Sequence, residues 1–380
     1  MMRTLIKNVV IATELGKEPA YIQVEDGRIQ AISSQNPESH FDKIIDGLGE
    51  LLIPGMIDVH IHGANHYDMM DGTTKSIQEV SKKCLATGCT GFLVTSVTSS
   101  LAQLIAMIEA VKQVIGKEEG AKILGIHLEG PYLNIEKKGM QDPHFIRHPD
   151  LNEMRKIIEH ANGLIKMVTV APELPGATEL IDYLRSLDII VAAGHTNATY
   201  EEASIAFHHG VTHITHCCNA MPQIHHRNPG ITTAALENDQ VSIQAIVDNV
   251  HLHPGMVRLM HKVKTAKRMV LITDALQAMG VGDGEYQFGG HHVTVLNGVA
   301  RLTDGTLASS TVTMNQALKI GTEMGIPLSD VIQMASNTPA TILGLEDLGA
   351  IKAGNIANLV FLDEHFEVSN VLLDGLLVSL

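Results

Sequence analysis

Cysteine is scarce in this sequence of 380 residues. The four cysteines are Cys84, Cys89, Cys217 and Cys218, and none belongs to a C-x-x-C pair. Adjacent residues on a strand point to opposite faces, so Cys217 and Cys218 would point apart there. We interpret all four as reduced thiols. This interpretation argues against a disulfide framework and against a structural zinc site, because such sites use closely spaced cysteines.

Long hydrophobic runs are missing as well. No segment offers the roughly 20 apolar residues that a membrane-spanning helix needs. The first residues, MMRTLIKNVVIATELGKEP, contain neither the sustained apolar stretch nor the small-residue cleavage site of a secretory signal. We therefore expect a cytoplasmic protein without a membrane partner.

Basic residues are fewer than acidic ones. The chain has 27 lysines and arginines against 42 aspartates and glutamates, which gives a formal net charge of −15. A charge of this sign repels nucleic acid and anionic lipid at long range, so neither is expected as a partner. An anionic small substrate would need a local basic pocket.

A repeating unit begins near residue 51. In each unit a short β-branched apolar run leads to a polar residue, a loop and a stretch with helical periodicity. Eight runs are candidate strands: 51–60, 91–97, 123–129, 165–173, 189–195, 211–216, 243–248 and 269–274. Amphipathic stretches separate them, among them 74–88, 101–116, 177–187 and 199–210. Alternation of strand and helix predicts parallel pairing.

Eight units over roughly 250 residues fit a (β/α)8 TIM barrel, an α/β fold whose functional groups lie at the carboxyl ends of the strands. Polar residues follow the apolar runs at that point: His60, Glu129, His195, His216, Asp248 and Asp274. An open doubly wound sheet is the alternative. It usually opens with G-x-G-x-x-G, which this chain lacks, so we predict the barrel.

The two ends of the chain have a different pattern. Short alternating strands are expected over 5–12, 20–32, 43–52, 356–363 and 367–380. Each end is too small to bury a core by itself. We predict that residues 1–52 and 346–380 form one small β-sandwich domain beside a barrel of residues 53–345. Two separate surface ribbons are the alternative.

The positions of some histidines are more informative than their number, which is 21. His60 and His62 end one apolar run and would share a face of the strand. His195 and His216 end two later runs, and Glu129 ends another. Nitrogen and oxygen donors of this kind suit zinc or iron, which predicts a metal site at the barrel rim. The alternative for any single histidine is a core or surface residue without a ligand role.

Five motifs occur in order along the chain: PGMIDVHIHG, LEGPY, AGHTNA, THCCNAM and LITDA. As a set they resemble the amidohydrolase superfamily and, within it, the deacetylases of amino-sugar phosphates. The resemblance covers essentially the whole chain. It implies a homodimer that removes the acetyl group from N-acetylglucosamine 6-phosphate.

The resemblance also implies one or two divalent ions per subunit, either zinc or iron. Some relatives replace the H-x-H pair and hold a single metal, whereas this chain keeps both histidines. One site would use His60, His62 and Glu129. The other would use Glu129, His195 and His216, with Glu129 bridging the two ions.

Amide hydrolysis needs reactive water and a polarised carbonyl. A metal that lowers the pKa of water from about 15.7 to about 7 contributes roughly 12 kcal/mol, whereas a positioned base gives about 10²- to 10⁴-fold. By the resemblance, Asp274 takes the proton from water and returns it to the leaving amine, and His251 helps to polarise the carbonyl. The alternatives are a buried structural carboxylate for Asp274 and an ordinary loop histidine for His251.

The resemblance places substrate contacts around the rim. Arg227 suits bidentate phosphate contact and His225 and His226 could add donors, although a surface basic cluster is the alternative. Arg258 is a second candidate, reaching the phosphate from a partner subunit. The other expected contacts are Met140, Gln141, Asn219, Ala220, Asp248, His251, Leu307, Ala308 and Ser309.

Three positions depart from the family pattern. Relatives usually have histidine, glycine and glycine where this chain has Gln141, Asn249 and Ser309. Gln141 can form hydrogen bonds but cannot be a cation, and the other two add bulk where backbone could approach a ligand. The reaction is therefore better defined than the sugar, and N-acetylgalactosamine 6-phosphate is a further candidate.

Two other functions are compatible with the sequence. Another amidohydrolase reaction, on a cyclic amide or a nucleobase-type amine, would use the same metal ligands without the phosphate loop. The second is a catalytically inactive scaffold, which would use the barrel for assembly and not for catalysis. Such scaffolds typically lose ligands, whereas the five expected ligands and Asp274 are all present here.

Overall fold

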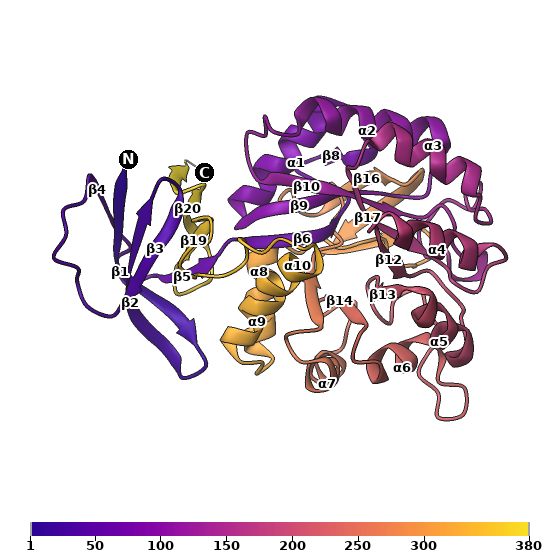
Figure 1. The fold of residues 1–380 in the computed structure, drawn as a ribbon. Helices are drawn as coiled ribbons and strands as arrows, with labels where there is room; N and C mark the ends of the chain where they lie inside the picture. Colours follow the sequence, from indigo (N-terminus) through magenta and orange to yellow (C-terminus); the bar gives the residue numbers. More distant parts are fainter. Residues whose placement is uncertain (1, 379–380) are drawn as a thin grey trace.

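A barrel of eight parallel strands forms the larger part of the computed structural model, which describes residues 2–378 (Figure 1). Neighbouring strands pair in sequence order, which confirms the predicted (β/α)8 fold. The strands are β6 (Met56–Ile61), β9 (Cys89–Ser96), β10 (Lys122–Glu129), β11 (Ile165–Val170), β12 (Ile190–Ala193), β13 (Val211–Ile214), β14 (Ser242–Ile246) and β15 (Met269–Ile272).

Helices cover the outside of the barrel (Figure 1). One helix follows each of the first seven strands, and three follow the last: α1 (Thr74–Ala86), α2 (Leu101–Val114), α3 (Leu151–Ala161), α4 (Ala177–Ser186), α5 (Tyr200–His209), α6 (Gly230–Glu237), α7 (Pro254–Lys264), α8 (Met314–Glu323), α9 (Leu328–Ala335) and α10 (Asn337–Ile342). Within residues 2–378, none of the helices has the length and apolar character needed to cross a membrane.

Helix α3 illustrates why these segments are helical. The Asp150 side chain accepts hydrogen bonds from the backbone N–H groups of Asn152 and Glu153, which caps the start of the helix. Met154 and Ile157 lie three residues apart and are buried on the face that packs against the barrel core. Such amphipathic faces hold the helices against the strands.

The run predicted as one strand over 51–60 is two strands in the structure. Leu51–Pro54 forms β5 of an outer sheet, and β6 begins after Gly55. A Cβ atom at Gly55 would lie 2.1 Å from Thr90 Oγ1, so the chain can pass this point only with glycine. The prediction was wrong here because a continuous apolar run does not reveal where a strand changes sheets.

The outer sheet combines both ends of the chain. Its order is β21-β20-β19-β5-β1-β2-β3, with β4 also paired to β1. The strands are β1 (Arg3–Thr13), β2 (Gly16–Glu25), β3 (Arg28–Ser33), β4 (Lys43–Asp46), β19 (Leu359–Leu362), β20 (Val368–Leu373) and β21 (Leu376–Val378). Ile6, Ile22, Ile29 and Phe361 share its core. A separate β domain built from the two ends is therefore present, and residues 379–380 of the last expected strand lie outside the described residues.

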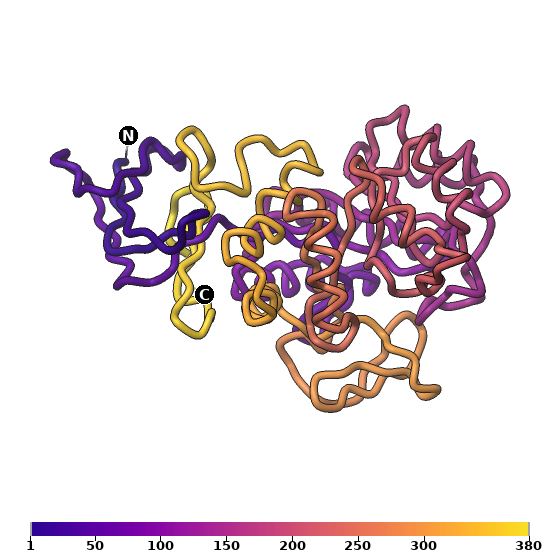
Figure 2. The backbone as a smooth tube through the Cα atoms, turned by 90° about the horizontal axis from the view of Figure 1, so that it is seen from below, coloured from indigo at the N-terminus to yellow at the C-terminus, as the bar shows by residue number. Residues whose placement is uncertain are grey.

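A three-stranded antiparallel hairpin that was not among the predicted strands follows the last barrel strand. It consists of β16 (Gly284–Phe288), β17 (His291–Leu296) and β18 (Val299–Leu302). Figure 2 shows this orange segment extending from the barrel. Phe288 packs in one cluster with Met140 and Leu276, so the hairpin lies against loops at the carboxyl ends of the strands.

Candidate metal centre and active site

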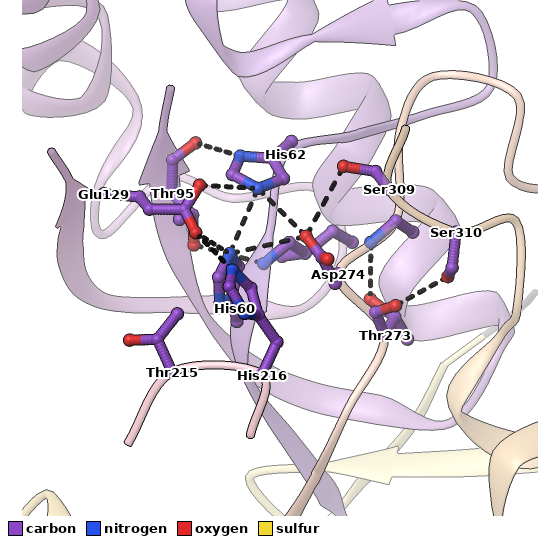
Figure 3. A network of polar contacts seen from close by, with 12 residues as sticks. His60, His62, Thr95, Glu129, Thr215, His216, Thr273, Asp274, Ser309 and Ser310 are labelled. Atoms are coloured by element: carbon purple, nitrogen blue, oxygen red, sulfur yellow. Dashed lines mark hydrogen bonds and ion pairs between the residues drawn. The ribbon is translucent and has the colours of Figure 1, made fainter. Parts of the chain in front are cut away.

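Six polar side chains meet at the carboxyl end of the barrel, five of which Figure 3 labels. They are His60 on β6 and His62 directly after it, Glu129 from the end of β10, and three residues that follow β12, β13 and β15, namely His195, His216 and Asp274. All six are buried. Residues from five different strands thus form one centre.

The first cluster contains His60, His62 and Asp274. The two imidazole Nε2 atoms lie 3.1 Å apart. Asp274 Oδ1 lies 3.4 Å from His60 Nε2 and 3.1 Å from His62 Nε2. The three ligand atoms therefore surround a common point, as they would around a bound cation.

The second cluster contains Glu129, His195 and His216. Glu129 Oε1 lies 3.2 Å from His195 Nε2 and 3.0 Å from His216 Nε2, and these two nitrogens are 3.0 Å apart. Glu129 also approaches the first cluster, because its Oε2 is 3.5 Å from His62 Nε2. The carboxylate thus lies between the two sets of imidazoles.

The orientation of the histidine rings fits metal binding. Nδ1 donates to a carbonyl oxygen in three of them: His60 to Gln244 Oε1 at 3.0 Å, His62 to Thr95 O at 3.3 Å and His195 to Lys137 O at 2.9 Å. In the neutral ring, a proton on Nδ1 leaves the lone pair on Nε2. Lone pairs that face one another at about 3 Å repel unless a cation lies between them, so these residues suit a divalent metal ion.

The ionisable side chains of the centre shift one another's pKa values. Burial opposes ionisation of Glu129 and Asp274, but neighbouring imidazoles outweigh burial and hold both pKa values below their usual range. Burial lowers the pKa of His60 to about 4. For His62 burial acts in the same direction, but without an ion, hydrogen bonding to Asp274 and nearby carboxylates raise its pKa to about 9, so a bound cation would take the place of the proton on Nε2. Asp274 is therefore an ionised acceptor at neutral pH.

Three of the residues in the centre lie in the left-handed backbone region. His195 has φ 47°, His216 has φ 26° and Asp274 has φ 50°. Non-glycine residues in such conformations cost of order 1–3 kcal/mol each, and they persist where surrounding contacts hold them. The turns after β12, β13 and β15 therefore direct these side chains inward at some cost in stability.

A cavity of about 310 Å³ opens above this centre. Glu129, His195, His216 and Asp274 form part of its wall, while His60 and His62 are buried and are not among the wall residues. The wall also contains eleven further residues: Gly139, Met140, Gln141, Asn219, Ala220, His251, Arg301, Gly305, Thr306, Leu307 and Ser309. Its size suits a small molecule.

Several residues expected at the substrate are not among the wall residues of this cavity. His226 and Arg227 are exposed on the loop before α6, and Arg227 Nη1 lies 2.8 Å from His226 Nε2. Asn249 is exposed as well, and Arg258 contacts Met324 O at 3.4 Å in its own chain. Neither His226 nor Arg227 is among the wall residues of the cavity.

Two other expected residues act behind the cavity wall. Asp248 Oδ2 accepts a hydrogen bond from His251 Nδ1 at 2.7 Å, and Asp248 Oδ1 accepts from the His251 backbone N–H. These bonds hold the pKa of Asp248 below its usual value despite burial, which raises it. Ala308 is buried next to Leu307, which lines the cavity. Asp248 thus fixes the ring of His251.

Sequence reasoning missed Arg301. Within residues 2–378, it is the one lysine or arginine side chain that lines the cavity. Arg301 lies on β18, and its Nη1 donates to Gly305 O at 2.8 Å. The alternating pattern of 291–302 was a signal for the hairpin, but it does not indicate that the hairpin turns back toward the barrel.

Comparison with known proteins agrees with this architecture. An N-acetylglucosamine-6-phosphate deacetylase from Bacillus subtilis is 36% identical over 372 residues, which cover 96% of this chain and 94% of the relative. An N-acetylgalactosamine-6-phosphate deacetylase from Escherichia coli O157:H7 is 34% identical, with 94% of each chain covered.

A solved structure gives a similar result. A mutant N-acetyl-D-glucosamine-6-phosphate deacetylase from Mycobacterium smegmatis, in complex with N-acetyl-D-glucosamine-6-phosphate, superposes with a TM-score of 0.91 at 31% identity. The match covers 99% of this chain and 98% of the other. The family model described as "Amidohydrolase family" matches residues 51–378. With its barrel, the histidines and carboxylates at its strand ends and these matches, the chain belongs to the amidohydrolase family.

Proposed function

We propose that this protein is a metal-dependent hydrolase that converts N-acetylglucosamine 6-phosphate and water into glucosamine 6-phosphate and acetate. The observation that carries the proposal is the pair of ligand clusters in the wall and floor of one cavity, with Asp274 among the ligands. The names of the relatives support the choice of an amino-sugar phosphate.

The cofactor in this proposal is one or two divalent ions, zinc or iron, held by His60, His62, Glu129, His195 and His216. Asp274 completes the set around His60 and His62. A bound ion would supply Lewis acidity, which polarises a carbonyl and makes water more acidic.

Asp274 carries the proton in the proposed reaction. Its carboxylate accepts a proton from the attacking water as the oxygen bonds to the acetyl carbon. It then donates that proton to the sugar nitrogen while the carbon–nitrogen bond breaks, which releases the amine and acetate. Ser309 Oγ lies 3.5 Å from Asp274 Oδ1 and adds a neutral donor beside this carboxylate.

His251 orients the substrate carbonyl in this proposal. Asp248 holds Nδ1, so Nε2 is the nitrogen left for the substrate. The wall residues Met140, Gln141, Leu307 and Ser309, with Ala308 behind them, surround the sugar.

Phosphate is the part of the substrate that needs cations in a chain of net charge −15. Arg227 and His226 provide donors from the exposed loop, and Asn219 and Ala220 line the cavity next to that loop. Arg301 provides a second guanidinium from the hairpin. We further propose a cytoplasmic homodimer in which Arg258 could serve the partner's phosphate.

Acetate release from four compounds tests the function: N-acetylglucosamine and N-acetylgalactosamine, each with and without the 6-phosphate. We expect turnover of the phosphorylated gluco sugar and at least a hundredfold lower kcat/KM without phosphate. Faster turnover of the galacto 6-phosphate would shift the assignment to the second candidate, in line with the E. coli relative. Equal turnover without phosphate, or none of any compound, would contradict the proposal and favour another amide.

A further inference from the structure

Gln141 is a buried glutamine that contacts one of the expected metal ligands. Its side chain is 1% exposed, and its Nε2 donates to Glu129 Oε2 at 2.6 Å. A neutral amide that donates to a carboxylate forms a charge-assisted hydrogen bond. Gln141 therefore acts on the metal centre in addition to lining the cavity.

The orientation of the Gln141 amide is fixed from its other side. Its Oε1 accepts a hydrogen bond from the backbone N–H of Thr98 at 2.7 Å. A backbone N–H cannot accept, so the oxygen of the amide must face Thr98 and the nitrogen must face Glu129. The main chain just beyond β9 thus sets which atom of Gln141 meets the carboxylate.

The Glu129 carboxylate needs such a contact because its last torsion is soft. Its Oε1 faces His195 and His216 at 3.2 and 3.0 Å and lies 3.5 Å from His60 Nε2, whereas its Oε2 faces His62 at 3.5 Å. Rotation of the carboxylate would withdraw an oxygen from one of the two sets. The amide of Gln141 opposes this rotation by holding Oε2, the oxygen on the side of His62.

We propose that Gln141 is a positioning residue that keeps Glu129 Oε2 beside His62 while Oε1 stays on His195 and His216, and so maintains affinity for the ion on the His60–His62 side. The inference rests on the proposed metal-dependent function. Because the amide is neutral, it orients the anion without adding a positive charge that would repel a divalent cation. Loss of such an outer contact typically weakens metal binding by about 10- to 100-fold.

The test compares metal content in wild-type protein and the Gln141→Met variant, which keeps the length of the side chain but lacks the donor. Both proteins are loaded with zinc, dialysed against increasing chelator concentrations and measured by elemental analysis. We expect Gln141→Met to lose one ion per chain at a chelator concentration about 10- to 100-fold lower than wild type, while the second ion is retained. Gln141→Ala, which adds no new bulk, should behave in the same way, and circular dichroism checks that both variants fold.

Gln277→Met is the matched control. Gln277 is also a largely buried glutamine at this end of the barrel, and its Nε2 donates to Gln287 O and not to Glu129. Its metal content should equal that of wild type. Equal metal loss in Gln277→Met and Gln141→Met would overturn the inference, because any disturbance of the rim would then have the same effect.

A substrate-binding role for Gln141 predicts a different result. In that case the Gln141 variants would hold both ions as tightly as wild type, and only KM would rise; this outcome would also overturn the inference. The metal measurement needs no substrate. Failure of wild-type protein to release acetate would therefore count against the proposed function while leaving the role of Gln141 to be decided by metal content.

Discussion

Asp274 is held in place by contacts of both its side chain and its backbone. Its carboxylate lies 3.1 Å from His62 Nε2, and the Ser309 hydroxyl approaches it from the cavity side. Its backbone N–H donates to His60 O at 2.8 Å, which fixes the residue in the left-handed region. Substitution by asparagine, which has the same shape, can therefore remove the charge of this side chain while leaving its position unchanged.

Asp274→Asn should lower kcat by about 10²- to 10⁴-fold, because the amide cannot accept and return a proton, while KM stays within a few-fold of wild type. Steady-state acetate release at saturating zinc, with metal content measured in the same preparation, checks this. Asp239→Asn, a change at an exposed aspartate before β14, is the control and should leave kcat unchanged. A kcat for Asp274→Asn within tenfold of wild type would exclude Asp274 as the proton carrier.

At the scale of elements, the first barrel strand, β6, and the last, β15, lie side by side below the metal centre and close the barrel. Asp58 Oδ2 accepts from Thr273 Oγ1 at 2.5 Å, and Asp58 Oδ1 accepts from the backbone N–H of His60 at 3.1 Å. Just beyond the strand end, the His62 N–H donates to Ala275 O. One buried carboxylate thus ties the strand that carries the histidine pair to the strand that leads to Asp274.

Asp58→Ala should lower the free energy of unfolding by about 2–4 kcal/mol, since buried hydrogen bonds to a carboxylate are lost and the Thr273 hydroxyl is left without an acceptor. Urea unfolding of the metal-free protein measures this. Thr273→Val should lower the free energy of unfolding by less than Asp58→Ala does. The double variant should lower it by less than the sum of the two single changes. A loss below about 1 kcal/mol for Asp58→Ala would show that the strand join does not depend on this carboxylate.

At the scale of the whole molecule, the proposed metal ligands come from strands around much of the barrel. His60 lies on β6 and His62 directly after it, Glu129 ends β10, and the other residues of the set follow β12, β13 and β15. An ion that binds only the folded arrangement stabilises it by mass action, by about 4 kcal/mol at a thousand times Kd. Metal binding and folding are therefore expected to be coupled in this protein.

Removal of metal with a chelator should abolish acetate release and lower Tm by several degrees, and zinc or iron should restore both. Magnesium is the control ion, since it prefers oxygen ligands and should restore neither property. Protein that contains no metal as purified, and whose Tm does not respond to zinc or iron, would favour the scaffold function instead.

The barrel and the residue types at its rim could be predicted from the amino-acid order alone. Periodicity marks strands and helices, and a polar residue that ends a parallel strand must face the same rim as the others. His60, Glu129, His195, His216 and Asp274 could be singled out for that reason, and their side chains do converge.

Which atoms meet could be learned only from the folded chain. The fold groups Asp274 with His60 and His62, directs the Gln141 amide to Glu129, and brings Arg301 to the cavity while Arg227 lies on an exposed loop. Periodicity gives the face on which a side chain lies, whereas distances between strands depend on register, on loop paths and on soft side-chain torsions. Contacts between residues far apart in the chain are fixed only when the barrel closes.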